Sequence, residues 1–147
     1  MTQNYSYPKW SDLPELELYL DQVLLYVNQV CSSAISQNDK GLTASMVNNY
    51  VKHGYVDKPV KKKYQRQQVA RLIAITTLKT VFSIQEIADT LNSLHDAAPS
   101  DQLYDDFVAY MNDEKSDVFP IIARSCQTIK LYQETLALIH QEVPHEY

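Results

Sequence analysis

Glycine is scarce in this chain, which has only two glycines among 147 residues. Because the tight turns of β-rich folds favour residues that tolerate positive φ, so little glycine argues against a sandwich or a barrel. Hydrophobic residues make up 45% of the sequence, which is enough apolar material for one domain with a real core. We therefore predict an all-α fold, a helical bundle with short connections.

Long hydrophobic runs are absent as well. No stretch approaches the ~18 apolar residues that a membrane span requires, and residues 1–10 lack the charged-then-apolar pattern of an export signal. The two cysteines, Cys31 and Cys126, lie inside apolar helical patterns. This placement is typical of small core residues in a reducing compartment, not of a disulfide or a metal site. We expect a cytoplasmic protein with no membrane partner.

The sequence also lacks the motifs of catalysis. It has no glycine-rich phosphate loop and no nucleophile elbow. The acidic pairs Asp105-Asp106 and Asp113-Glu114 would point about 100° apart on a helix, which indicates solvated charge and not an acid/base pair. No metal-ligand spacing relates the four histidines, which are His53, His95, His140 and His145. We expect a protein that is not an enzyme and that binds no cofactor or metal.

Charge is distributed very unevenly along the chain. The net charge is −5, yet residues 52–79 carry eight basic residues against one acid, Asp57, for a segment charge of +7. The rest of the chain therefore carries −12. The eight basic residues are Lys52, Lys58, Lys61, Lys62, Lys63, Arg66, Arg71 and Lys79. This contrast predicts a local binding surface for a polyanion, and the alternative is a solvated basic face with no partner.

Hydrophobic periodicity predicts a long first helix over residues 12–36. Asp12 and Glu15 have the spacing of a capping box, Pro14 suits a first helical turn, and the polar run 36–41 ends the pattern. Apolar residues recur at three- and four-residue steps at Leu16, Leu20, Val23, Leu24, Val27, Val30, Cys31 and Ala34. Before this helix, residues 1–10 are expected to form an arm that packs through Tyr5, Tyr7 or Trp10.

A short second helix is predicted over residues 43–53, with Thr43 as its N-cap and Gly54 as its stop. Two short extended pieces follow, 55–56 and 60–64, separated by Asp57-Lys58-Pro59. We expect them to pair as a small β-hairpin, or wing.

The remaining elements are all predicted to be helical. A third helix spans about 66–80 with Val69, Leu72, Ile73, Thr76 and Leu78 inward, and a fourth begins after the cap Ser83 with Ile84, Ile87, Ala88, Leu91 and Leu94 inward. Residues 96–118 are acidic but contain enough apolar residues for a packed helix. The last helix runs from Pro120 to about Gln141 with a heptad-like stripe at Ile122, Ser125, Ile129, Tyr132, Leu136 and Ile139.

Residues 42–91 carry a resemblance. Leu42 to Val56 reads Leu-Thr-Ala-Ser-Met-Val-Asn-Asn-Tyr-Val-Lys-His-Gly-Tyr-Val, a basic hairpin then ends in Tyr64, and Phe82 begins Phe-Ser-Ile-Gln-Glu-Ile. This order resembles the DNA-binding domain of the MerR regulator family, in which a recognition helix ends in Tyr-x-x-x-Gly, a wing ends in basic-x-Tyr and a later helix opens with Phe-Ser-Leu-x-Glu-Ile. The resemblance implies a winged helix-turn-helix within the bundle.

Over its whole length the chain is similar to a bacterial family defined as a domain of unknown function. The segments 18–22, 48–53 and 59–64 resemble its hallmarks. We expect residues 1–95 to hold the winged helix-turn-helix with its long first helix. Residues 96–147 are expected to form a helical region, packed on the first, that dimerises or senses a signal.

The predicted site reads DNA with helix 43–53 and holds phosphates with the basic wing 55–66. Asn48 and Asn49 suit bidentate contact with adenine, and Ser45 suits a base edge or a phosphate. Six basic side chains on phosphates would give a log–log salt slope of about −5. Tyr64 is expected either to contact the DNA backbone or simply to pack. The full predicted set is Thr43, Ser45, Asn48, Asn49, Lys52, His53, Lys58, Lys61, Lys62, Lys63, Tyr64 and Arg66.

Two functional hypotheses follow. The first is a transcriptional regulator that binds double-stranded DNA as a homodimer, with an effector that the sequence does not specify. The second is a protein–protein interaction module that uses the winged-helix surface, because this fold also serves that role. Within the second hypothesis, the acidic residues 96–118 could fold over the basic face and weaken its affinity for DNA.

Overall fold

The structure is a computed structural model, and it describes residues 5–35, 39–114 and 117–141. Within these ranges the chain is mostly helical, as predicted, and it adds a small two-stranded antiparallel sheet. The elements in chain order are a 3-10 helix η1 (Trp10–Asp12), β1 (Leu18–Tyr19), α1 (Leu20–Val30), α2 (Ala44–Lys52), β2 (Lys63–Tyr64), α3 (Arg66–Leu78), α4 (Ile84–Leu94), α5 (Ser100–Met111) and α6 (Pro120–Ile139). None of the described helices has the length and apolar character to cross a membrane.

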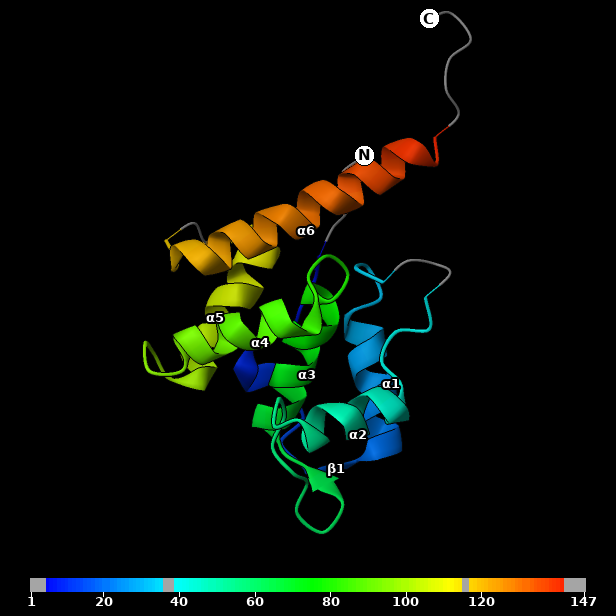
Figure 1. The fold of residues 1–147 in the computed structure, drawn as a ribbon, viewed down its shortest axis with the longest axis vertical. Helices are drawn as coiled ribbons and strands as arrows, with labels where there is room; N and C mark the ends of the chain where they lie inside the picture. The colour runs from blue at the N-terminus through cyan, green and yellow to red at the C-terminus, as the bar shows by residue number, and fades with distance from the viewer. Residues whose placement is uncertain (1–4, 36–38, 115–116, 142–147) are drawn as a thin grey trace, which may run out of the picture.

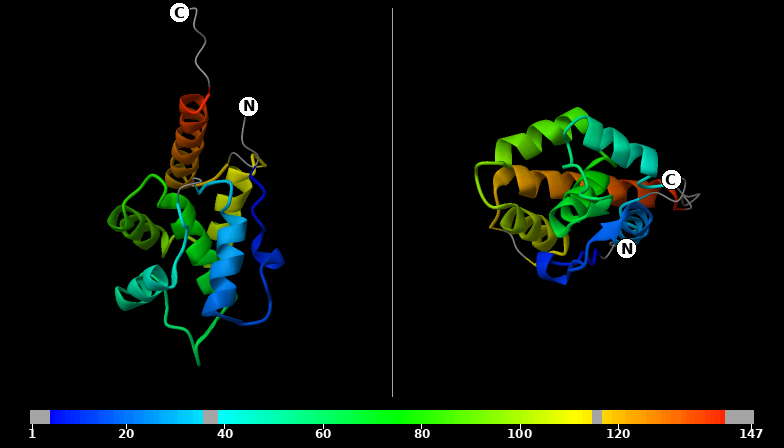
Figure 2. Two further views of the ribbon diagram at one scale, coloured as in Figure 1. Left: turned by 90° about the vertical axis from the view of Figure 1, so that its right-hand side faces the viewer. Right: turned by 90° about the horizontal axis from the view of Figure 1, so that it is seen from below.

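The helix α3 forms the centre of the fold, with the other helices packed around it (Figures 1 and 2). Its buried residues lie on every side of the helix, because α1, α4, α5 and α6 all contact it. The five inward residues predicted for this helix are all buried, namely Val69, Leu72, Ile73, Thr76 and Leu78. From Gln68 to Leu78 every residue of α3 is buried except Arg71 and Ala74, which are half-buried.

A single hydrophobic core runs through the described chain. It extends from Tyr7 near the start to Ile129 in α6 and includes residues on both sides of position 95. The predicted packing of the N-terminal arm is confirmed, because the Tyr7 hydroxyl lies 2.8 Å from Thr77 Oγ1 and the side chain of Asn112 bonds both the N–H and the carbonyl of Tyr7. Cys31 and Cys126 are buried free thiols, as the sequence predicted.

The first helix is shorter than predicted. Helix α1 begins at Leu20 instead of residue 12, because Leu18 and Tyr19 pair with β2 and are therefore extended. Its start is stabilised by the Gln22 side chain, which accepts a 2.9 Å hydrogen bond from the backbone N–H of Tyr19. Residues 12–17 thus do not form the predicted capping box. At the other end α1 stops at Val30, and the predicted end at Ser36 lies outside the described residues.

The wing prediction is wrong in its strand pairing. Residues 55–56 do not pair with 60–64, because their backbone N–H groups bond back to the carbonyl of Tyr50, at 2.8 Å from Tyr55 and 3.4 Å from Val56. These bonds terminate α2, and they use the backbone donors that Tyr55 and Val56 would need to pair with another strand. The sheet forms instead between β1 and β2, with Leu18 opposite Tyr64 and Tyr19 opposite Lys63.

Helices α5 and α6 pack against each other on one side of α3. Helix α5 also contacts α3 and η1, and it lies on the opposite side of α3 from α2 (Figure 2). In this structure the acidic residues of α5 therefore do not cover the basic face. Acidic side chains are used elsewhere, since Asp105 accepts a 2.7 Å hydrogen bond from the Trp10 N–H and Asp113 pairs with Lys130.

The predicted stripe along α6 is buried only in its first half. Ile122, Ser125 and Ile129 are buried, whereas Tyr132 and Ile139 are exposed. Helix α6 has 20 residues and its partner α5 has 12, so at about 1.5 Å per residue α6 is about 12 Å the longer. Its C-terminal half accordingly projects beyond the body of the molecule (Figure 1).

Candidate nucleic-acid interface

Helix α2 presents a polar stripe to solvent. Its start is capped as predicted, because Thr43 Oγ1 accepts a hydrogen bond from the Met46 N–H at 3.3 Å, and Gly54 ends the helix region with a φ of +77°. Ser45, Asn48, Asn49 and Lys52 are all exposed. Their spacing of i, i+3, i+4 and i+7 places them in one row along the helix. The structure thus brings four predicted site residues together on one face.

The opposite face of α2 fixes the helix to the core. Val47 and Tyr50 are buried there, with 0% and 2% of their surface exposed. At the C-terminal end, His53 Nδ1 lies 2.9 Å from the carbonyl oxygen of Asn49, and the His53 ring stacks on Tyr55. Thr43 and His53 therefore act at the two ends of the helix, where they hold it in place, and the stripe between them is exposed.

A tight hairpin lies beside α2, although its turn is not the one predicted. Val60 and Lys63 exchange two backbone hydrogen bonds, of 3.1 and 2.9 Å, and enclose Lys61 and Lys62 at the tip. Both lysines have positive φ, 51° and 66°, as a two-residue type I′ turn requires. The turn therefore places two exposed ammonium groups at the tip of the hairpin.

Three of the predicted phosphate contacts are instead turned towards the protein. Tyr64 is 3% exposed and belongs to the core, so of its two predicted roles the structure shows packing. Lys63 is half-buried, with its Nζ 5.5 Å from the centre of the Tyr19 ring. Arg66 donates a 3.2 Å hydrogen bond to the carbonyl of Leu13. The cations of the predicted set that remain exposed are Lys52, Lys58, Lys61 and Lys62.

Two residues outside the predicted site, Gln68 and Arg71, hold the segment between α2 and the hairpin. The side-chain amide of Gln68 donates to the carbonyls of Asp57 and Lys58, at 2.9 and 3.0 Å. The Nε of Arg71 donates to the carbonyl of Tyr55 at 2.6 Å. Both come from α3, so the central helix positions the basic segment. No local pattern signals these bonds, because they join residues 10 to 16 positions apart.

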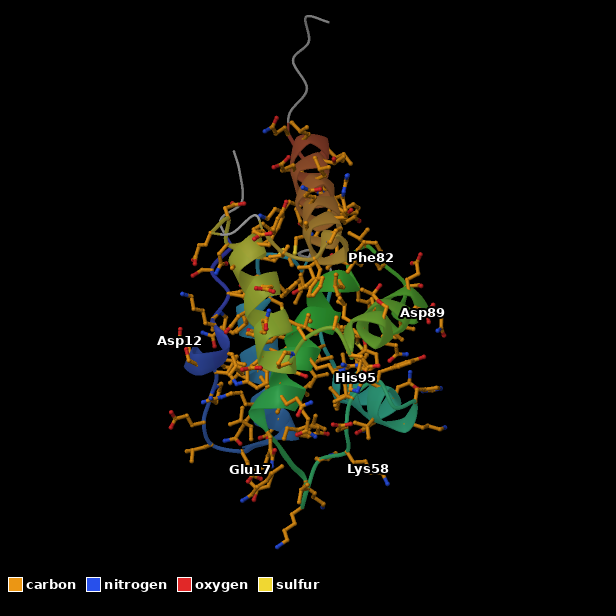
Figure 3. The ribbon with its side chains drawn as sticks, turned by 90° about the vertical axis from the view of Figure 1, so that its left-hand side faces the viewer. Asp12, Glu17, Lys58, Phe82, Asp89 and His95 are labelled. Carbon is orange, nitrogen blue, oxygen red and sulfur yellow. The ribbon has the colours of Figure 1, made fainter. Side chains whose placement is uncertain are left out.

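The α2 stripe and the hairpin meet at a shallow depression. Asn48 from α2, Pro59 and Lys62 from the hairpin, and Asp21 from α1 all line it, with Tyr64 beneath. Asn48 and Lys62 therefore belong to one continuous surface, which is the arrangement that a DNA reader needs. Acidic side chains lie close to this surface, with Glu17 near the same end of the molecule as Lys58 (Figure 3).

No group of three His, Cys, Asp or Glu side chains in the part of the chain that the structure describes is arranged to hold a metal ion. His95 follows the end of α4 (Figure 3), and His145 lies outside the described residues. The chemistry of the candidate interface is thus hydrogen bonding by amides and a hydroxyl, together with the positive charge of four lysines.

Comparison with known proteins places the chain in a family. Residues 8–107 match the family model described as Domain of unknown function (DUF1836). The chain belongs to the DUF1836 family. The DUF1836 match contains the α2 stripe, the hairpin and all of α3, and it ends within α5, before α6. Neither the curated proteins nor the solved structures give a significant match.

Proposed function

We propose that the protein is a cytoplasmic DNA-binding transcriptional regulator that places α2 in the major groove and the hairpin on the phosphate backbone. The observation that carries this proposal is the exposed row Ser45, Asn48, Asn49 and Lys52, which lies beside the lysine tip of the hairpin. In this proposal the chain works as a MerR-like winged helix-turn-helix, with the hairpin ending in β2 as its wing. The two free buried thiols favour a reducing compartment.

Base readout is assigned to the two asparagines. An Asn side chain offers a donor and an acceptor that match N7 and the N6 amino group of adenine, so Asn48 and Asn49 favour A·T pairs in the site. Ser45, one turn earlier on the same face, can bond a base edge or a phosphate. Because Val47 and Tyr50 anchor the other face of α2, the stripe is held in a fixed orientation.

Phosphate binding is assigned to the four exposed lysines, Lys52, Lys58, Lys61 and Lys62. Each neutralised phosphate contributes about −0.9 to the slope of log affinity against log salt, so four give about −4. This slope is smaller than the value of about −5 expected from six cations, because Lys63 and Arg66 contact Tyr19 and Leu13 instead.

Dimerisation is assigned to the projecting half of α6. Leu131 and Leu138, seven residues apart, are each 63% exposed, and Ile139 is 64% exposed. A second copy of the same helix would cover this apolar row, as in a coiled-coil seam. Sedimentation analysis is expected to show a dimer that Leu131→Glu/Leu138→Glu converts to a monomer. A monomeric wild-type protein would contradict this part of the proposal.

The hairpin tip also supports the alternative function, a protein–protein interaction module. Val60 is 61% exposed beside the two lysines, and an apolar group among cations suits an acidic protein partner as well as a phosphate backbone. The two functions differ in what α2 must do, because only DNA reading needs the two asparagines for sequence preference.

Selection of bound duplexes from a random pool, followed by affinity measurements on the enriched sequence, tests the proposal. We expect Asn48→Ala/Asn49→Ala to lose the preference for that sequence while it keeps the salt slope of the wild type. Gln29→Ala, an exposed change on α1, serves as the control. A pool with no enriched sequence would reject base readout by α2 and favour the interaction module.

A further inference from the structure

A cavity lies between α3, α4, α5 and α6, on a different part of the molecule from the α2 stripe. Its volume is about 110 Å³. Two alanines of α3, Ala70 and Ala74, leave the space open, and apolar side chains such as Leu91, Leu94, Phe107 and Ile122 form the walls. An apolar cavity of about 150 Å³ in another protein binds benzene, so this smaller cavity suits an apolar group no larger than about a benzene ring.

The cavity has an unusual electrostatic character. Its polar lining includes the Arg71 guanidinium and, after the end of α4, the His95 imidazole, but no Asp or Glu among the described residues. The hydroxyls of Thr90 and Ser125 are already bonded to carbonyls of their own helices, at 2.9 and 2.6 Å from the acceptors in Glu86 and Ile121. A ligand entering the cavity therefore meets apolar walls and one positive charge.

Arg71 supplies the positive charge of the cavity lining. It is half-buried, its Nε bonds the Tyr55 carbonyl, and within the described residues its two terminal Nη groups have no hydrogen bond or ion pair. Burial lowers the pKa of Arg71, and the charge of Asp57 offsets this shift only in part. Within the described residues no carboxylate forms an ion pair with the guanidinium. A planar guanidinium in this state fits a carboxylate, which two parallel hydrogen bonds can hold.

We propose that this cavity binds a small monocarboxylate with an apolar body of about the size of a benzene ring, and that Arg71 holds its carboxylate. The apolar body lies between Ala74 and the walls from α4 and α5. The inference does not rest on DNA binding, because the site and its ligand are separate from the α2 stripe.

The same guanidinium connects the cavity to the end of α2. Arg71 Nε holds the Tyr55 carbonyl, and the backbone N–H groups of Tyr55 and Val56 bond the Tyr50 carbonyl that terminates α2. A carboxylate on the Nη groups fixes Arg71 and therefore changes the surroundings of Tyr55. The site is thus placed to couple ligand binding to the position of the basic segment.

The test is titration of the ¹⁵N-labelled full chain with benzoate, followed by amide chemical shifts, with benzyl alcohol as the uncharged ligand of the same size. We expect saturable benzoate binding that shifts the Tyr55 and Val56 amides, and weaker binding of benzyl alcohol by about tenfold. Arg71→Met should remove this difference between the two ligands. Arg124→Met, an exposed arginine of α6, should leave it unchanged.

A second variant tests the cavity without changing its charge. Ala74→Leu fills the space with a larger side chain and is expected to abolish binding of both ligands while the thermal unfolding transition is retained. The proposal is overturned by equal binding of benzoate and benzyl alcohol to the wild type, by benzoate binding that survives Ala74→Leu, or by no saturable shift up to about 10 mM benzoate.

Discussion

Val60 and Lys63 exchange two backbone hydrogen bonds that close the hairpin over Lys61 and Lys62. This relationship forces both lysines into the left-handed region, which costs a residue with a side chain of this kind about 1 kcal/mol. Asn-Gly is the pair that such a turn prefers. The hairpin therefore carries two charges at its tip in place of residues that would be more stable there.

Replacing the tip by Lys61→Asn/Lys62→Gly is accordingly predicted to have opposite effects on stability and binding. The free energy of unfolding should rise by about 1–2 kcal/mol, because the turn is relieved. The salt slope of DNA binding should fall in magnitude by about 2, because two phosphate contacts are lost. Urea unfolding and fluorescence anisotropy measure the two effects. A variant that is more stable and binds DNA as the wild type does would show that the hairpin tip is not part of the interface.

Gln68 is predicted to position the basic segment. Gln68→Leu leaves the carbonyls of Asp57 and Lys58 without their donor and should lower the free energy of unfolding by about 2 kcal/mol. It should also weaken DNA binding, although Gln68 is buried and lies outside the exposed α2–hairpin surface, because the basic segment loses its support. The matched control is Gln29→Leu on the exposed side of α1, which is expected to change stability by less than about 0.5 kcal/mol.

The two glycines allow the cost of a steric clash to be separated from the cost of backbone strain. Both have positive φ, +72° at Gly41 and +77° at Gly54, so alanine costs about 1 kcal/mol at either position. At Gly54 an added Cβ meets open space, whereas at Gly41 it would lie 2.3 Å from Asn28 Oδ1.

Asn28 bonds both the N–H and the carbonyl of Leu42, at 2.7 and 2.9 Å, and it cannot move without breaking these bonds. Gly41→Ala should therefore destabilise the protein by about 2 kcal/mol more than Gly54→Ala. Chemical denaturation of the two variants measures the difference. Equal losses would show that Asn28 does not hold the loop before α2.

Local sequence signals predicted both ends of α2 and the start of α4, because Thr43, Gly54 and Ser83 act on neighbouring backbone groups. The pairing of Leu18 with Tyr64 was not predictable in the same way, since the two residues are 46 positions apart and each strand has only two residues. The exposed stripe of α2 followed from helical spacing. The contacts of Lys63 and Arg66 with the protein could not be predicted from helical spacing. They depend on Tyr19 and Leu13, which are distant in the sequence.

The buried thiols predict a loss of stability at alkaline pH. Burial raises the pKa of Cys31 and of Cys126 from 9.0 to about 12. Above pH 9 the unfolded chain therefore loses thiol protons that the folded chain keeps, and stability falls as the pH rises towards 12. Between about pH 8 and pH 10.5 each thiol should contribute a loss of about 2 kcal/mol.

Urea unfolding at the two pH values checks this loss, with Cys31→Ala/Cys126→Ala as the comparison. The double variant should be less stable at pH 8, because it leaves cavities, but its stability should depend less on pH. Some dependence remains, since burial also raises the pKa of Tyr7 and Tyr104. An unchanged pH dependence in the double variant would mean that the thiols ionise in the folded chain.

The most direct test of the central claim is the salt dependence of binding to a random-sequence duplex, measured for the wild type and for Lys61→Glu/Lys62→Glu. A second double variant, Lys9→Glu/Arg124→Glu, makes the same change in net charge on exposed residues outside the α2–hairpin surface. We predict a log–log slope of about −4 for the wild type and for the control, and loss of binding in the hairpin variant. No binding by the wild type at low salt, or equal loss in both variants, would contradict a nucleic-acid interface at α2 and the hairpin.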